Sequence, residues 1–179
     1  MKKIKSVLLN EKEISKAMLR LSHEIVENFS DLDSIGIIGI RTRGEPLAKR
    51  IVNNIKKLYK KEINFGTLDV TFYRDDFSTN LGSPEVGPSE INFDINKKNI
   101  ILIDDVLYTG RTIRAALDEL FSYGRPSKVK LGVLVDRGHR ELPIKADFIG
   151  KNYPTAAHEH IHVLLKETDN IEEVNIVEY

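Results

Sequence analysis

Several residue types and patterns are missing from this sequence, and each absence narrows what the chain can do. The 179 residues contain no cysteine, which excludes disulfides, zinc–thiolate centres and thiol nucleophiles. Lysine plus arginine and aspartate plus glutamate both number 27, so the net charge is zero and no overall basic field attracts nucleic acid. Any nucleic-acid binding must therefore use a local basic patch.

Long apolar runs are also missing. No stretch of 18 apolar residues is present, and the run VLL near the N-terminus is too short for the core of a signal peptide. These features predict a cytoplasmic protein with no membrane contact. The length fits a single domain over residues 1–179, large enough for a real hydrophobic core.

Three common motifs of nucleotide and acyl chemistry are absent or incomplete. Gly82 and Gly87 have the spacing of a phosphate-binding P-loop, but Pro88 stands where that motif requires lysine. The stretch GIIGIRTRG lacks the G-x-G-x-x-G pattern of dinucleotide-binding folds, and no G-x-S-x-G nucleophile elbow is present. The sequence therefore does not support these three classes.

Helical and strand periods alternate along the chain. Apolar residues recur with helical spacing in 13–29, in a segment that begins at Pro46, and in a segment that ends at Gly124. Strands are expected at 34–40, 67–73, 100–104 and 128–136, and as short strands near ADFIG, HIHVLL and EVNIVEY. This alternation predicts an α/β fold in which helices cover a mostly parallel sheet.

A long irregular segment interrupts the pattern. Residues 74 to 98 show no period and contain two prolines and two glycines. Irregular segments of this length inside a compact domain are usually disordered or act as functional lids. We therefore expect a flexible loop in this region.

The stretch IILIDDVLYTGRTIRAALDEL, residues 100–120, carries the clearest chemical signal. Asp104 and Asp105 end a predicted strand, where open α/β sheets bind ligands. The Thr-Gly-Arg-Thr turn then opens a helix, whose N-terminal N–H groups suit a phosphate. A ligand with a phosphate, a diol and a metal explains the pair of carboxylates. Solvated acids at a strand end are the plainer alternative, but the complete string favours a ligand.

This motif resembles the phosphoribosyl pyrophosphate (PRPP) binding motif of type I phosphoribosyltransferases. The stretches GIRTRGEPLAKRI, LDVTFYRDD and LVDRGHRELPIKADFIGKN are similar to the PyrR family of bifunctional pyrimidine attenuation regulators and uracil phosphoribosyltransferases. The resemblance implies a mostly parallel central sheet flanked by helices, a small hood from the C-terminal and N-terminal parts, and a flexible loop at about 74–95. It also implies the reaction of uracil with PRPP to UMP and pyrophosphate, with Mg²⁺.

The resemblance assigns roles to residues within the motif. Asp104 and Asp105 would hold the ribose hydroxyls, favour the positive charge that develops on the ribose, and face Mg²⁺ largely through PRPP and water. The residues assigned to the 5′-phosphate and its surroundings are Leu107, Tyr108, Thr109, Gly110, Arg111 and Thr112.

Other segments receive roles in the same way. The stretch RTRG, residues 41–44, resembles the pyrophosphate loop, with Thr42 and Arg43 as binding residues, although two solvated arginines would give the same pattern. Such loops often carry a strained or cis non-proline peptide, which Gly44 would accommodate. The remaining assignments are Arg74 and Arg137 to catalysis, Asp136 and Val163 to binding near the base and pyrophosphate, and the backbone of 149–151 to uracil.

The resemblance further implies binding of a pyrimidine-operon leader RNA when UMP or UTP is plentiful, and assembly into homodimers or homotetramers. The positions that match the family's RNA-binding face are Arg20, His23, Arg140, Lys145 and Lys151. Leu19 and Asn28 stand where the family often has a hydroxyl and an arginine.

Two alternatives and one local pattern remain open. The chain could be an RNA-binding regulator that keeps the site only to sense UMP or PRPP, or a phosphoribosyltransferase for another base. His158, His160 and His162 alternate in HEHIH and would share one strand face, a spacing that could bind zinc or nickel. A polar strand face without metal is the favoured interpretation, because structural zinc sites usually add thiolates or a carboxylate.

Overall fold

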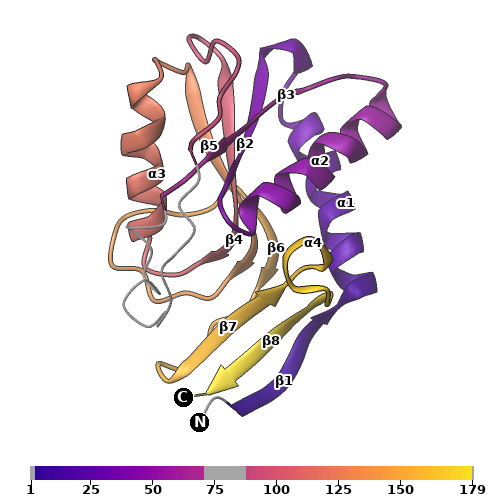
Figure 1. Cartoon of the computed structure of the whole chain (residues 1–179), viewed down its shortest axis with the longest axis vertical. Helices are drawn as coiled ribbons and strands as arrows, with labels where there is room; N and C mark the ends of the chain where they lie inside the picture. The colour runs from indigo at the N-terminus through magenta and orange to yellow at the C-terminus, as the bar shows by residue number, and fades with distance from the viewer. Residues whose placement is uncertain (1–2, 71–87, 179) are drawn as a thin grey trace.

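Two sheets organise the part of the chain that this computed structural model describes, residues 3–70 and 88–178 (Figure 1). The larger sheet is parallel, with the strand order β3-β2-β4-β5-β6. Its strands are β2 (Ile35–Ile40), β3 (Asn64–Leu68), β4 (Asn99–Leu107), β5 (Lys128–Asp136) and β6 (Phe148–Asn152). The smaller sheet is antiparallel, with the order β1-β8-β7.

Helices cover both faces of the larger sheet. The helices α1 (Glu11–Glu27) and α2 (Gly44–Tyr59) lie on one face, and α3 (Arg111–Ser122) lies on the other (Figure 1). In β4, Ile101 and Ile103 belong to the core beneath α1 and α2. Ile100 and Leu102 alternate with them and pack beneath α3. A strand covered on both faces needs an apolar residue at nearly every position, which explains the continuous run IILI.

The smaller sheet forms the predicted hood. It joins β1 (Lys3–Asn10) to β7 (Glu159–Leu164) and β8 (Glu173–Glu178), so both ends of the chain contribute to it. The short helix α4 (Lys166–Asp169) connects β7 to β8. In Figure 1 the hood lies beyond the carboxyl ends of the strands of the larger sheet. The hood therefore faces the edge where the sequence places the ligand.

A capping box that the sequence interpretation did not identify starts α1. The Asn10 side chain accepts a hydrogen bond from the Glu13 N–H at 3.1 Å, and the Glu13 carboxylate accepts one from the Asn10 N–H at 2.9 Å. Ile14, Leu21 and Ile25 then face the core. The helix expected at 13–29 is confirmed, and it begins two residues earlier because of this cap.

Three strand assignments differ from the sequence-based expectation. The strand placed at 67–73 corresponds to β3, which starts earlier than expected because Asn64 and Gly66 interrupt any apolar pattern in the sequence. The strand β3 ends at Leu68, and residues 71–73 of the predicted strand lie outside the described residues. The strand β1 was not expected, since most of its residues are exposed. The strand placed at 100–104 continues to Leu107, where it still pairs with β5. Asp104 and Asp105 therefore lie inside β4 and not at its end.

The predicted flexible loop at about 74–95 lies largely outside the described residues, and Arg74 lies outside them entirely. The end that is described returns to the larger sheet. Thr67 and Glu90 exchange two backbone hydrogen bonds of 2.8 Å each. None of the helices within 3–70 and 88–178 is both long enough and apolar enough to cross a membrane.

Candidate active site

Two buried carboxylates stand near the carboxyl end of β4. Asp104 and Asp105 are 1% and 5% exposed. The Asp104 carboxylate accepts a hydrogen bond from the Asp105 N–H at 2.9 Å, and the Asp105 carboxylate accepts one from the Val106 N–H at 2.8 Å. These local bonds help to orient both side chains. Carboxylate oxygens accept hydrogen bonds from hydroxyl groups and coordinate hard divalent cations, so the pair suits a sugar diol or Mg²⁺.

The loop of residues 41–44 reaches the backbone of β4 at Ile103 and Asp104. A Cβ atom on Gly44 would come within 2.3 Å of the Ile103 carbonyl oxygen and 3.1 Å of the Asp104 Cα. Only glycine allows the start of α2 to approach β4 this closely. The peptide bond between Arg41 and Thr42 is cis, in line with the expectation for this loop.

The two arginines of the loop have partners within the protein. The Arg41 Nε donates to the Glu45 carboxylate at 3.1 Å. The Arg43 guanidinium donates to the Asp169 carboxylate through Nε at 3.2 Å and through Nη2 at 2.8 Å. Asp169 lies in α4, so the second arginine joins the loop to the hood. They are therefore not the solvated pair that was the alternative interpretation.

The turn after β4 has the geometry expected of an anion site. Gly110 has a φ of 95°, a left-handed conformation that favours glycine. The Thr109 hydroxyl accepts a hydrogen bond from the Arg111 N–H at 3.1 Å, which tightens the turn. The helix α3 begins at Arg111, so its partial positive charge is located at this turn.

Arg137 joins this turn to the hood. It follows β5 and is only 3% exposed. Its Nε donates to the Thr155 hydroxyl at 3.0 Å, and its Nη2 donates to the Glu159 carbonyl at 2.6 Å. The guanidinium carbon also lies 3.9 Å from the centre of the Tyr108 ring. A buried cation is thereby placed between the predicted phosphate turn and β7.

The hood carries Val163, the residue assigned to the surroundings of the base. Val163 is buried in β7 at 3% exposure. On the same strand, burial and the nearby positive charge of Arg137 lower the pKa of His160. An imidazole with a lowered pKa stays neutral near pH 7, so this histidine adds no charge beside the predicted base pocket.

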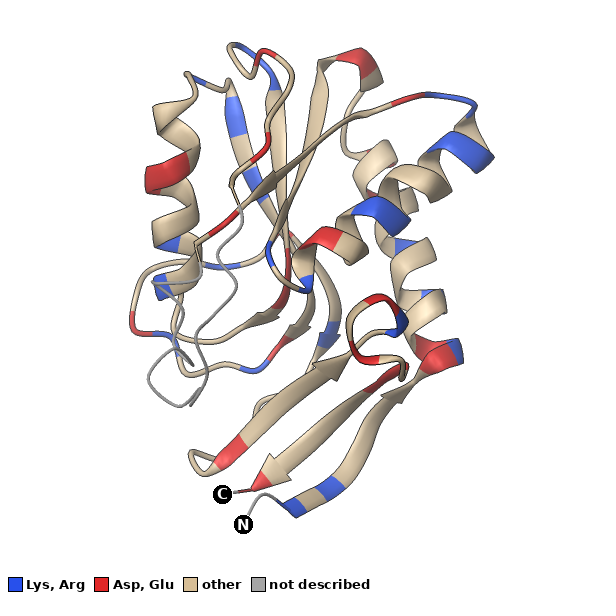
Figure 2. Ribbon diagram, viewed as in Figure 1, with Lys and Arg blue, Asp and Glu red and all other residues tan. Residues whose placement is uncertain are grey.

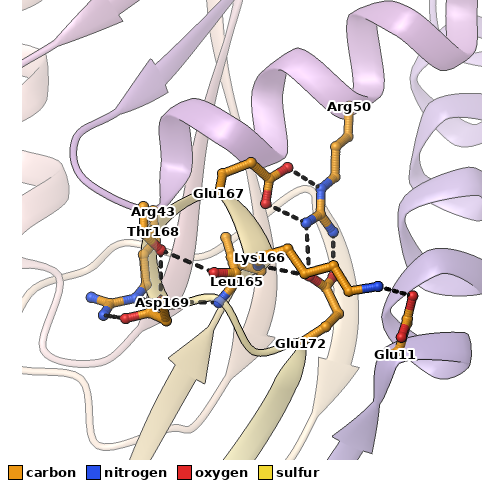
Figure 3. A network of polar contacts seen from close by, with 9 residues as sticks. All are labelled: Glu11, Arg43, Arg50, Leu165, Lys166, Glu167, Thr168, Asp169 and Glu172. Atoms are coloured by element: carbon orange, nitrogen blue, oxygen red, sulfur yellow. Dashed lines mark hydrogen bonds and ion pairs between the residues drawn. The ribbon is translucent and has the colours of Figure 1, made fainter.

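Ion pairs fasten the hood to α2 (Figure 3). Arg50 donates to the Glu167 carboxylate at 2.8 and 2.6 Å and also pairs with Glu172. Arg43 and Arg50 are seven residues apart, about two helical turns, so they lie on the same side of α2. Figure 2 shows acidic residues around α4 close to basic residues of α2. No motif links partners more than 100 residues apart, so the sequence analysis missed this network.

Burial and hydrogen bonding act in opposite directions on Asp169. Burial raises the pKa of its carboxyl group, but hydrogen bonds from Arg43, Thr168 and the Leu165 N–H outweigh that effect. The pKa of Asp169 is therefore held below its usual range, and the carboxylate is ionised at neutral pH.

The residues predicted to bind RNA differ in how they are held. Lys145 and Lys151 are exposed. The Arg20 Nη2 donates to the carbonyls of residues 149 and 150 at 3.1 and 2.6 Å, which places Arg20 beside the strand that carries Lys151. The His23 Nδ1 lies 2.6 Å from the Tyr59 hydroxyl.

Arg140 does not fit the expectation of a guanidinium turned toward RNA. Its Nε donates to the Ile144 carbonyl and its Nη1 to the Tyr108 carbonyl, both at 2.8 Å. Its Nη2 pairs with the Asp136 carboxylate. The side chain is 23% exposed. An RNA contact by this residue remains a prediction, and these bonds point to a structural task.

The oxygen donors of the site are compatible with Mg²⁺. Within the described ranges, no three or more His, Cys, Asp or Glu side chains gather as a ready metal site. Mg²⁺ is commonly held by one or two carboxylates together with water and substrate phosphate oxygens. Asp104 and Asp105 provide such a pair.

Sequence comparisons decide the family. A model of the phosphoribosyl transferase domain matches residues 6–168. A bifunctional protein PyrR from Bacillus cereus (strain AH820) is 51% identical over 174 residues, which cover 96% of this chain and 97% of the relative. Another, from Thermoanaerobacter sp. (strain X514), is 47% identical over 176 residues, which cover 98% of this chain and 99% of the relative. The chain belongs to the PyrR family. The resemblance noted from the sequence is thereby confirmed.

Solved structures show that this PyrR family member has the type I phosphoribosyltransferase fold. A hypoxanthine-guanine phosphoribosyltransferase from Bacillus anthracis superposes with a TM-score of 0.74 at 20% identity, over 100% of both chains. A hypoxanthine phosphoribosyltransferase from Trypanosoma cruzi gives 0.75 at 15% identity, over 98% of this chain and 96% of that one. At these identities the likeness establishes the fold alone, and the predicted fold class is confirmed.

Proposed function

We propose that the protein transfers the ribose 5-phosphate of PRPP to uracil, giving UMP and pyrophosphate. The observation that carries this proposal is the meeting of three elements at one edge of the larger sheet: the buried carboxylates, the loop 41–44 and the turn 108–112. Membership of the PyrR family favours uracil over the purine bases named for the structural neighbours.

The reaction determines what each element does. The C1–O bond to pyrophosphate breaks, the bond from C1 to a uracil nitrogen forms, and that nitrogen loses its proton to the released pyrophosphate or to water. Positive charge therefore builds on the ribose and negative charge on the leaving group. Asp104 and Asp105 accept hydrogen bonds from the ribose hydroxyls and stabilise the developing cation. The loop 41–44 holds the pyrophosphate, and the turn at Thr109 and Gly110 holds the 5′-phosphate. Positioning of the two reactants and stabilisation of the developing charges would together provide most of the rate acceleration.

The metal and the base use neighbouring groups. Asp104 and Asp105 would face Mg²⁺, largely through PRPP and water, and the ion offsets negative charge on the leaving pyrophosphate when bound. Uracil would be recognised by backbone groups of residues 149–151 and of the hood around Val163. Recognition by backbone N–H and C=O groups explains why the base pocket has no side-chain signature in the sequence.

A panel of bases tests the enzymatic proposal and its rivals together. Uracil, orotate, hypoxanthine and guanine are each supplied with PRPP and Mg²⁺, and pyrophosphate release and nucleotide formation are measured. We expect turnover with uracil. Turnover with another base alone would change the substrate. A protein that binds UMP but turns over none of the four would be a sensor without transferase activity.

The second proposed activity is binding of pyrimidine-operon leader RNA in the presence of UMP or UTP. The support is the exposed pair Lys145 and Lys151, together with Arg20 beside β6 and His23 on α1. With no net charge on the chain, such a local face must supply the phosphate contacts. We propose a cytoplasmic location, because the protein would have to meet nascent leader RNA.

Two measurements test the regulatory proposal. A gel-shift titration of a pyrimidine-operon leader hairpin, with and without UMP, should show tighter binding with UMP, because the nucleotide would favour the RNA-competent state. Absence of binding at micromolar protein in low salt, with an active enzyme in the same preparation, would leave a transferase without a regulatory role. Light scattering tests the homodimer or homotetramer that we propose for the protein in solution.

A further inference from the structure

The segment 136–144 supports the turn that follows β4, and Arg140 lies at the centre of that support. The Arg140 Nη1 donates to the Tyr108 carbonyl at 2.8 Å and to the Leu107 carbonyl at 3.4 Å. Its Nε donates to the Ile144 carbonyl at 2.8 Å. One guanidinium thus connects the far end of the segment to the turn.

The same segment makes further contacts with the turn. The backbone N–H groups of Glu141 and Leu142 both donate to the Thr109 carbonyl, at 3.0 and 3.2 Å. A Cβ atom on Gly110 would lie 3.4 Å from side-chain atoms of Leu142 and Ile144. This is an ordinary contact distance, so the support segment packs against the turn at Gly110.

The Arg140 side chain is also bonded to residues of its own segment, 136–144. Its Nη2 pairs with the Asp136 carboxylate at the end of β5, and its Nη1 lies 3.3 Å from the Gly138 carbonyl. The Gly138 N–H in turn donates to the Asp136 carboxylate at 3.0 Å. A planar guanidinium with donors in fixed directions is suited to hold several carbonyl oxygens at once, and a lysine would reach fewer of them.

These bonds set the direction of three consecutive peptide groups. In a trans peptide the C=O and the following N–H point in opposite directions. The carbonyls of Leu107, Tyr108 and Thr109 all point toward the support segment. The N–H groups of Tyr108, Thr109 and Gly110 consequently point away from it. Successive N–H groups on one side of a turn, ahead of the start of α3, form a concave anion site.

We infer that Arg140 is a positioning residue for the 5′-phosphate of PRPP and UMP. It acts through the turn, by fixing the carbonyls on one side so that the N–H groups are presented on the other. This inference rests on the proposed function, and it differs from the RNA contact that the sequence assigned to Arg140. It deepens the assignment of the turn, because it explains what holds the phosphate-binding conformation in place before the ligand arrives.

The phosphate is remote from the reacting C1 atom, which gives the inference a kinetic signature. An interaction made equally in the ground state and in the transition state changes KM and leaves kcat unaltered. For Arg140→Ala we expect KM for PRPP to rise about tenfold or more, the scale of a lost charge-assisted hydrogen bond, with kcat nearly unchanged. Arg140→Lys should lie between the wild type and Arg140→Ala.

The experiment compares wild type, Arg140→Ala, Arg140→Lys and the control Arg114→Ala. Arg114 is an exposed arginine of α3 that pairs with Asp118, so its removal tests the loss of an arginine outside the support segment. Kinetics with PRPP are combined with calorimetry of UMP and of uridine, which lacks the phosphate. Thermal melting reports the folded state. Affinity for UMP should fall in Arg140→Ala far more than affinity for uridine, and the control should match wild type.

Several outcomes would overturn the inference. A folded Arg140→Ala that keeps the wild-type KM for PRPP and loses only leader-hairpin binding would return the residue to the RNA face. Equal losses for UMP and uridine would indicate general damage to the site. If Arg140→Ala does not fold, Arg140→Lys decides by the same comparison of UMP with uridine. A wild type that neither makes nor binds UMP would contradict the proposed function itself.

Discussion

Arg43 at the start of α2 and Asp169 at the end of α4 form a two-pronged ion pair, with N–O distances of 3.2 and 2.8 Å, across 126 residues of sequence (Figure 3). Arg43 belongs to the loop assigned to pyrophosphate, and Asp169 belongs to the hood that carries Val163. The pair therefore connects the loop 41–44 to the hood. The adjacent fork of Arg50 on Glu167 holds α4 in the position that this pairing needs.

Asp169→Asn should impair PRPP binding while preserving the fold. The substitution removes the charge that holds the Arg43 guanidinium but keeps the size of the side chain. We expect KM for PRPP to rise by about three- to tenfold, in keeping with the loss of one charge-assisted pair at a partly exposed site. Steady-state kinetics measure it, with Glu62→Gln as the control for an exposed pair with Lys56. An unchanged KM would mean that the loop is set independently of the hood.

The lowered pKa of Asp169 predicts that wild type and Asp169→Asn differ in how their stability changes in acid. The folded-state pKa of Asp169 is lowered from 3.8, so the folded state binds fewer protons than the unfolded state as the pH falls through this range. Its stabilising contribution is present above the unfolded pKa and is lost as the pH falls through the lowered folded value. In urea unfolding at a series of pH values, the free energy of unfolding should fall less below about pH 4 in Asp169→Asn than in wild type. Parallel curves would contradict this.

Removal of Lys145 and Lys151 should weaken RNA binding and make the affinity depend less on the salt concentration. Each lost phosphate contact should reduce the magnitude of the slope of log K against log salt by roughly 0.7 to 0.9. The double variant Lys145→Ala, Lys151→Ala is titrated with the leader hairpin at several salt concentrations. Lys56→Ala, Lys61→Ala removes the same charge from two other exposed lysines and should keep the wild-type slope. Identical slopes in the two double variants would exclude the proposed face.

The alternating histidines should prove dispensable for transfer. His158 lies 3.6 Å from Glu178, an ordinary surface contact. We expect simultaneous replacement of His158, His160 and His162 by glutamine to retain uracil transfer within a few-fold. Elemental analysis of untagged protein provides a separate test. Stoichiometric zinc in wild type that the triple variant lacks would establish a metal site on this strand.

The sequence predicted the fold to the extent that local pattern specifies it. The run at β4 was identified because a strand buried on both faces requires apolar residues, and the turn that follows it was identified as a helix start suited to a phosphate. The strand β1 was missed because an exposed hood strand has no such requirement. The capping box at Asn10 was visible in the sequence as an asparagine three residues before a glutamate, and it could have been found.

The contacts that support the site could not be predicted from the sequence, for a physical reason. Asp169 meets Arg43, and Thr155 and Glu159 meet Arg137. These contacts form only after the hood has folded onto the larger sheet. Hydrogen bonds of this kind join distant positions and leave no spacing to detect. Arg140 shows the complementary case, in which a basic residue that resembles an RNA contact is committed to backbone carbonyls.

If Asp104 and Asp105 are catalytic, their replacement should abolish most of the transfer of ribose 5-phosphate to uracil. The formation of UMP from labelled uracil and PRPP is followed for wild type and for the double variant Asp104→Asn, Asp105→Asn, with thermal melting to confirm that both are folded. The loss of one charged transition-state contact commonly costs about a hundredfold or more in rate, so the variant should lose at least that much. Wild-type turnover in the folded double variant would contradict the account.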